Sequence, residues 1–255
     1  MPPRFALARP LLLALILVLV SACGGSGDNK VPPTATGGAS TTISEPTTSG
    51  TLAANEVTAG QIADLIASAW PTVERYVSVT IILPVSGTPA ASPEVELTGR
   101  AERDVILPNT KRIAITDQGA TTEIVLVDGV LSKRATPPGG KPGPWSTVDP
   151  AKIDASDPFS PTYNTILAPE TPPYSGLSDR QRQRIGTVQG QSTLNGRTCT
   201  DYLFPEVSDT GLMFKVVISL DSANLPCRIA TTTGQSLSQT DYVFNTAVSI
   251  ATPAP

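Results

Sequence analysis

From Tyr76 onward the chain repeats one pattern, in which apolar and polar side chains alternate over short runs separated by tight-turn sequences. Alternation with period two is typical of a β-strand that buries one of its faces. Asp128-Gly129 and Asn195-Gly196 are strong two-residue hairpin signals between such runs. We expect strands over residues 76–83, 94–107, 111–117, 121–127, 130–134, 145–148, 185–194, 197–204, 212–220, 227–233 and 240–250. About ten or eleven antiparallel strands are predicted, as a sandwich, a barrel or a partly open barrel.

Two helical segments accompany these strands. Thr58 and Gln61 fit a capping box, and an apolar stripe follows, which comprises Ile62, Leu65, Ile66, Ala69 and Trp70. Pro71 should end this helix. Residues 149–178 are rich in proline and lack the alternation, but Asp157-Pro158 resembles the start of a short helix that reaches about Leu167. The fold class predicted is α+β, with one large curved antiparallel sheet, an N-terminal helix and a short central helical lid.

The N-terminus has the three parts of a secretory signal peptide. Residues 1–10 include Arg4 and Arg9 and no acidic residue, and residues 11–20 are an unbroken apolar run. Such a run is too short to cross a bilayer, which takes about 20 residues. Small residues then lead into Cys23. We therefore expect residues 1–22 to be removed after export.

The sequence Val20-Ser21-Ala22-Cys23 resembles the lipobox of bacterial lipoproteins. This resemblance implies that the Cys23 sulfur receives a diacylglyceryl group and that cleavage leaves Cys23 as the first residue. An ordinary secretory signal with a chance cysteine is the alternative. Residues 23–55 are dominated by Gly, Ser, Thr and Pro, and we expect a disordered tether there, followed by a folded domain over residues 56–252. The expected location is the outer face of the cytoplasmic membrane, or the outer membrane in a cell that has two.

Two further cysteines, Cys199 and Cys227, lie in the exported part. An even pair in an oxidising compartment usually forms a disulfide. A simple meander would place one strand between them, which gives a separation of about 9 to 10 Å. A bond at that distance requires the chain to fold over near Pro226. Two buried thiols are the alternative.

Charge and composition exclude several classes of function. The chain has 18 Lys and Arg against 22 Asp and Glu, a net charge of −4, which argues against a nucleic-acid partner. Histidine is absent, which excludes serine–histidine and cysteine–histidine catalysis and histidine-based metal sites. We therefore expect no enzyme, no metal and no cofactor. No protein partner can be named from the sequence.

Short phrases along about residues 56–250 resemble, in order and spacing, the LolA/LolB-like proteins, and most nearly the LppX/LprG group of lipoprotein carriers. The phrases are residues 94–107 followed by 111–117, then 122–131, 144–149, 196–202 and 225–229. The chain departs from that group in having few Tyr and Phe residues, and in having Cys227 where the last phrase is usually apolar. The resemblance implies a half-open barrel, lined by apolar side chains and covered by helices, that holds acyl chains.

The hydrophobic effect also favours acyl-chain binding. Burial of the apolar strand faces is favourable by about 25 cal/mol per Å², and two short helices can cover only a small part of a large sheet. A lipid or another hydrophobic small molecule would complete the core and could be passed between membrane layers. The predicted cavity residues are Val79, Ile81, Leu97, Ile113, Ile115, Leu126, Val216 and Ile218. Each is equally well explained as packed core. A non-enzymatic sensor or protein-interaction module on the same scaffold is the alternative function.

Arg180, Arg182 and Arg184 alternate along the chain, so an extended backbone would place them on one face. Such a row could contact anionic lipid head groups, at about 1 kcal/mol per arginine. The alternative is a solvated row of charges that protects the edge of a strand.

Overall fold

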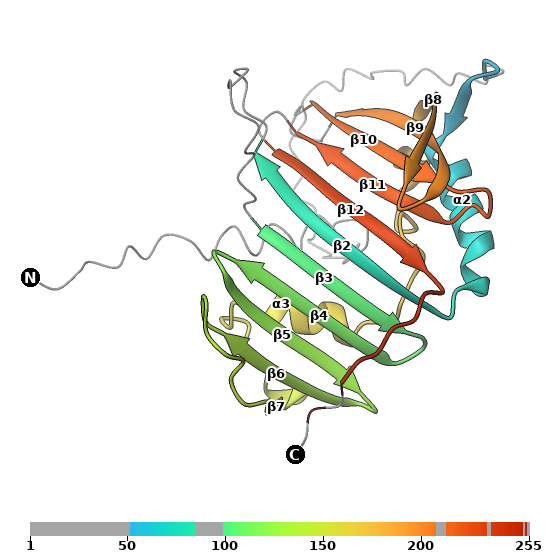
Figure 1. Ribbon diagram of the computed structural model, residues 1–255. Helices are drawn as coiled ribbons and strands as arrows, with labels where there is room; N and C mark the ends of the chain where they lie inside the picture. Colours follow the sequence, from blue (N-terminus) through green and yellow to red (C-terminus); the bar gives the residue numbers. More distant parts are fainter. Residues whose placement is uncertain (1–51, 85–98, 208–212, 234–235, 252, 254–255) are drawn as a thin grey trace, which may run out of the picture.

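The computed structural model describes residues 52–84, 99–207, 213–233, 236–251 and 253, and it contains one antiparallel sheet of 12 strands (Figure 1). The strands are β1 (Glu56–Thr58), β2 (Arg75–Pro84), β3 (Gly99–Ile106), β4 (Thr110–Asp117), β5 (Ala120–Val127), β6 (Val130–Thr136), β7 (Ser146–Val148), β8 (Ile185–Leu194), β9 (Arg197–Val207), β10 (Met213–Leu220), β11 (Pro226–Thr232) and β12 (Ser236–Phe244). The helices are α2 (Ala59–Ala69), α3 (Ser160–Leu167) and α4 (Asp179–Arg182), with 3₁₀ turns η1 (Trp70–Thr72) and η2 (Pro150–Lys152).

The sheet is built from two meanders that meet at its centre. Strands β2 to β7 follow one another to one edge, while β8 to β12 run from the other edge back to β2. The two halves join through the β12–β2 pair, and β1 adds to the far edge beside β8. Because β1 and β7 do not pair, the sheet stays open, which confirms the predicted α+β fold with a curved, half-open sheet. The strand count of ten or eleven was low, chiefly because the three-residue β1 is too short for its alternation to be recognised.

Both predicted hairpins are present. Asp128 and Gly129 have φ values of 50° and 79°, and Asn195 and Gly196 have values of 51° and 74°. Two successive positive φ values define the type I′ turn, whose twist matches that of the strands it joins. Gln118-Gly119, with φ values of 48° and 79°, forms a third such turn between β4 and β5.

Helix α2 begins as predicted. The Gln61 amide donates to Thr58 Oγ1 at 3.1 Å, and the Thr58 amide donates to Gln61 Oε1 at 2.7 Å. The helix ends at Ala69, and Pro71 lies in the 3₁₀ turn that follows. Within the expected stripe, Ile62 and Ile66 are fully buried, whereas Leu65 is 38% exposed.

The ends of two segments differ from the prediction. Helix α3 starts at Ser160, because the Asp157 side chain accepts from the Phe159 amide and forms a turn before the helix. The last strand covers Ser236–Phe244, whereas residues 240–250 were expected. It ends because Asn245 has a φ of 53° and its side chain accepts from the Glu74 amide. The first part of the expected strand 94–107 lies outside the described residues.

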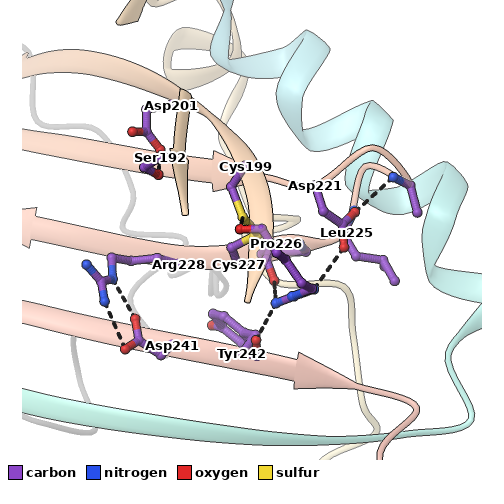
Figure 2. Close-up of a disulfide and its surroundings, with 12 residues drawn as sticks. Ser192, Cys199, Asp201, Asp221, Leu225, Pro226, Cys227, Arg228, Asp241 and Tyr242 are labelled. Carbon is purple, nitrogen blue, oxygen red and sulfur yellow. Dashed lines mark hydrogen bonds and ion pairs between the residues drawn. A yellow bond between two sulfur atoms is a disulfide. The ribbon is translucent and has the colours of Figure 1, made fainter. Parts of the chain in front are cut away.

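Cys199 and Cys227 form a disulfide, with their Cα atoms 6.5 Å apart (Figure 2). Their strands, β9 and β11, lie on either side of β10. The register between β10 and β11 shifts between Ser219 and Leu220, so that Leu220 pairs with Pro226. The sequence analysis required the chain to fold over near Pro226 if the two cysteines were to bond. The irregularity meets that condition, because it brings Cys227 across the end of β10.

Candidate functional site

The helices pack on one face of the sheet, which we call the inner face. In Figure 1, α3 lies behind β4 and β5 and the chain returns behind the sheet from α3 towards β8. Residues that stand directly opposite one another on neighbouring strands share a face. The register therefore defines a row of inner-face residues across six strands: Ile218, Ile229, Thr240, Thr80, Ala101 and Ile115.

Apolar packing gathers at the two ends of this row. At one end, Ile62 and Ile66 of α2 pack with Phe204 of β9 and with Val216 and Ile218 of β10. Gly186 of β8 is required there, because a Cβ at that position would lie 2.4 Å from the Phe204 ring. At the other end, the members of the cluster come from β4, β5, β6 and α3, namely Ile113, Ile115, Ile124, Leu126, Leu131, Tyr163 and Ile166.

A third cluster lies where β2 begins. Val73, Tyr76, Val105 and Leu225 are its buried members, and Trp70 packs against them. The Trp70 and Tyr76 rings are 5.7 Å apart between centroids. This cluster closes one side of the inner face.

The middle of the inner face carries small side chains. Ser78, Thr80 and Thr240 are buried there, and Thr80 Oγ1 lies 2.9 Å from Thr240 Oγ1 in a hydrogen bond across the β2–β12 pair. Ile82 is also buried but belongs to none of the three clusters formed by the described residues. Helices α2 and α3 thus pack on the two ends of the inner face. The small residues lie between the α2 cluster and the α3 cluster.

Beside these small residues, three side chains meet around one carboxylate. Glu170 lies in the segment after α3, and its Oε1 is 2.6 Å from Arg103 Nη2 and 3.0 Å from Lys111 Nζ. The Tyr76 hydroxyl donates to Glu170 Oε2 at 2.6 Å, and Lys111 also donates to the Ala168 carbonyl. We call Tyr76, Arg103, Lys111 and Glu170 the Glu170 cluster. It fixes the segment after α3 to β2, β3 and β4.

Burial raises the pKa values of two tyrosines near this cluster. Burial raises the pKa of Tyr76 well above its usual range, and the hydrogen bond to Glu170 raises it further. Burial also raises the pKa of Tyr242 to about 12, although the Arg103 charge opposes that shift. Tyr76 thus keeps the proton that it donates to Glu170 over an even wider pH range than a free tyrosine would.

The structure places the predicted cavity residues on both faces. Five of them belong to the packed clusters at the ends of the inner face, namely Ile113, Ile115, Leu126, Val216 and Ile218. They therefore have the role of packed core, which was the alternative to lining a cavity. Leu97 lies outside the described residues.

The expectation that Val79 and Ile81 share that face is wrong. Val79 stands opposite Asp241 and Glu102, and Ile81 stands opposite Gln239 and Arg100. These positions alternate with the inner-face residues. The face of β2 that turns inward is instead Tyr76, Ser78, Thr80 and Ile82. This inward set is less apolar than the set that contains Val79 and Ile81, although its Tyr76 ring packs with Trp70 and Phe244. The alternation alone therefore pointed to the wrong face.

The opposite, outer face carries ion pairs across β3 to β6. Arg112 contacts Asp104 at 2.7 Å and Glu123 at 2.9 Å, and Arg134 contacts the other oxygen of Glu123 at 2.5 Å. Burial opposes ionisation of Glu123, but hydrogen bonds from Arg134 and Arg112 outweigh it and lower the pKa of this carboxyl below its usual value. This network stabilises the sheet from the side away from the helices.

The predicted row of Arg180, Arg182 and Arg184 does not form, because the chain there is not extended. Residues 179–182 are the helical turn α4, which Ser178 and Gln181 cap. Arg182 instead makes a bidentate ion pair with Asp64 of α2, at 2.7 and 2.8 Å. Both of these side chains are partly exposed.

A hollow of about 420 Å³ lies beside the disulfide, at the β8–β9 turn. Its lining is polar and comprises Gln191, Arg197, Thr198, Thr200, Asp221 and Ser222. Arg197 lines this hollow and donates hydrogen bonds to the Asp221 carboxylate and to the carbonyls of Pro226 and Tyr242. Such a lining does not suit an acyl chain.

Two features are absent from the part of the chain that the structure describes. None of its helices is both long and apolar enough to span a membrane. No group of three or more His, Cys, Asp or Glu residues in that part is arranged to hold a metal ion.

Sequence reasoning missed the Glu170 cluster. Glu170 lies in a proline-rich stretch without periodicity, and no sequence signal connects it to β3 or β4. Lys111 did carry a signal, because it precedes Ile113 and Ile115 at the same period of two and therefore had to face inward. A lysine in an inward position requires a buried partner.

The sequence matches no protein-family model and no curated protein. Solved structures do match. The chain is 16% identical to LprF from Mycobacterium bovis, over 77% of this chain and 97% of that one, with a TM-score of 0.45. It is 11% identical to the lipoprotein LppX from Mycobacterium tuberculosis, over 76% and 98%, with a TM-score of 0.32. For a LolA superfamily protein from Nitrosomonas europaea the identity is 10%, over 73% and 92%, and the TM-score is 0.26.

These matches include the kinds of protein that the sequence phrases resemble.

Proposed function

We propose that this chain is a lipid-anchored extracytoplasmic protein that binds a lipid or another hydrophobic molecule on the inner face of its sheet. It performs no chemistry on that molecule. Binding and release follow from a difference in affinity between two arrangements of the cover over the sheet. The same property would allow it to pass the ligand from one membrane layer to another.

The observation that supports this proposal most directly is the separation of the packed clusters. Helix α2 packs on β9 and β10 and helix α3 packs on β4 and β5, with Ser78, Thr80 and Thr240 between them. Large apolar side chains in the middle would join the clusters into one core. The small ones there are buried beneath the cover and would give a guest molecule room once that cover shifts. We therefore assign the ligand to the inner face over β12, β2 and β3.

An acyl chain suits this position because apolar clusters flank it. Each buried methylene group contributes about 0.8 kcal/mol, so about ten of them would give roughly 8 kcal/mol before the costs of ordering are subtracted. Ile115 and Ile218 would contact the chain from the two sides.

The N-terminus supplies the proposed location. The lipobox at Cys23 would place two acyl chains in the membrane, and two chains hold a protein far more firmly than one. A tether with the Gly-, Ser-, Thr- and Pro-rich composition of residues 24–51 would have an r.m.s. reach of about 30 Å. The folded domain would thus remain close to the membrane surface from which it takes its ligand.

The test is extraction of lipid from the purified full chain, followed by mass spectrometry. We expect about one equivalent of non-covalently bound acyl lipid. Thr80→Phe should abolish it by filling the middle of the inner face, whereas Val79→Phe, the next residue on the same strand, should retain it because Val79 faces outward. Circular dichroism would verify that both variants fold.

A wild-type chain that carries no lipid and binds no acyl probe would overturn the proposal. A lipid-free chain that instead captures one stable protein partner would favour an interaction module on the same scaffold.

A further inference from the structure

The Glu170 cluster has an unequal charge balance. Arg103 and Lys111 are both cationic, and the Glu170 carboxylate is their only anionic partner among the described residues. The nearby acids Glu102 and Asp104 pair with arginines of the outer face. Tyr76 donates to Glu170 and adds no negative charge. The cluster therefore carries one excess positive charge, although the Lys111 side chain is only 3% exposed.

Arg103 also has an unused donor. Its Nη2 bonds Glu170, but its Nε is buried and has no hydrogen-bond partner within the described part of the chain. Buried polar groups almost always have a partner, and a charged donor without one is particularly costly. An unpaired N–H on a cation indicates that an anionic acceptor belongs beside it.

The location of this donor connects it with the inner face. Arg103 stands directly opposite Ser78, and Ser78 stands opposite Tyr242. The guanidinium thus borders the small residues over which we place the ligand. Its side chain is 21% exposed as a whole, but Nε itself is buried, so a bound molecule reaches Nε only when the cover over the inner face shifts.

We propose that Arg103, with the charge of Lys111 behind it, binds the anionic head group of an amphipathic ligand, a carboxylate or a phosphate. This inference rests on the proposed function and adds a class of ligand to it. A guanidinium presents several donors in a fixed fork, so Nη2 can hold Glu170 while Nε donates to an oxygen of the ligand. The ligand then supplies the second negative charge of the cluster, and its tail lies over the middle of the inner face.

The experiment compares octyl phosphate, octanoate and octan-1-ol, which share a tail, with inorganic phosphate, which has none. Binding to the full chain in nanodiscs of zwitterionic lipid is measured by calorimetry, with empty nanodiscs as the reference. We expect at least one of the two anionic probes to bind about tenfold or more tightly than the alcohol, and inorganic phosphate alone to bind more weakly than octyl phosphate.

The variants test whether Arg103 is responsible. Arg103→Gln should lower the affinity for the anionic probes to that for octan-1-ol measured on the same variant, so that the preference for the anionic head group is lost. Arg100→Gln is the matched control, because it removes the same charge from the same strand on the outer face and should keep the preference. If Arg103→Gln does not fold, Arg103→Lys keeps the charge but lacks the Nε donor, and should reduce the preference several-fold.

The outcomes separate this inference from the proposed function. Equal binding of both anionic probes and the alcohol would overturn the head-group site while leaving a hydrophobic ligand in place. Inorganic phosphate that binds as tightly as octyl phosphate would also overturn it, since the site would then serve a free anion. Failure of all the probes to bind would overturn both proposals.

Discussion

The ammonium group of Lys111 lies 3.0 Å from the carboxylate of Glu170, and the two side chains are only 3% and 4% exposed. The pair joins the start of strand β4 to the segment after α3, and Arg103 contacts the same carboxylate. A buried charge is tolerated only when it has a partner. The inner face of the sheet is therefore held to its cover by electrostatics as well as by apolar packing.

The two partners should differ in their effect on stability. Glu170→Gln leaves Arg103 and Lys111 facing each other without an anion, and we expect the free energy of unfolding to fall by about 3–5 kcal/mol. Lys111→Met leaves Arg103 paired one to one with Glu170, so its loss should be about 1.5 kcal/mol or less. Urea denaturation of both variants checks this. Equal losses would show that the excess positive charge has no energetic consequence.

The disulfide should contribute substantially to stability. It closes a loop with a sequence separation of 28 residues, for which loop entropy predicts about 3 kcal/mol. Replacing Cys199 and Cys227 together with alanine should therefore lower the free energy of unfolding by about that amount. Denaturation with and without a reductant provides the control, because the reductant should destabilise the wild-type chain and have no effect on the double variant.

Acid should weaken the outer face through Glu123. The folded state holds the pKa of this carboxyl below its ordinary value of 4.5. The stabilising contribution is thus complete above pH 4.5 and is lost as the pH falls through the lower pKa of the folded state. Glu123→Gln should flatten the decline in the free energy of unfolding between pH 6 and pH 3.5, as followed by denaturation at several pH values. An unchanged slope in the variant would contradict the assignment.

Neighbouring residues of α2 should respond very differently to truncation. Ile66 is fully buried against β9 and β10, so Ile66→Ala should cost about 2–5 kcal/mol. Leu65 is 38% exposed, and Leu65→Ala should cost less than about 1 kcal/mol. Thermal or chemical denaturation distinguishes the two. Similar losses would mean that α2 does not pack on the inner face through the Ile66 side.

Processing at Cys23 can be tested by intact mass spectrometry of the full chain after export in a bacterium. We expect a product that lacks residues 1–22 and carries a diacylglyceryl group on Cys23. Cys23→Ser should lack that modification, whereas Cys199→Ser, which leaves the lipobox intact, should retain it. A mature chain with an unmodified Cys23 thiol would show that the signal is an ordinary secretory one.

Local patterns in the sequence were sufficient to predict most elements of this fold, although not the short strand β1 or the helical turn α4. The capping box at Thr58 and Gln61 and the turns at Asp128-Gly129 and Asn195-Gly196 depend on residues close in the chain, so their physics is visible in a short window. The same holds for the alternation along the strands, although it does not reveal which face is covered. For this reason the sequence assigned Val79 to the wrong face.

The tertiary structure alone decided how those elements form a site. Period two requires that Val79 and Thr80 point to opposite faces, but only the register with β3 and β12 determines which of them meets the helices. The Glu170 cluster depends on contacts across 67 and 94 residues, to Arg103 and Tyr76. Such contacts form because folding brings distant charges into a medium of low dielectric constant where they require partners. The sequence thus determined most of the strands and the turns between them, while the fold determined the inner face and the charges on it.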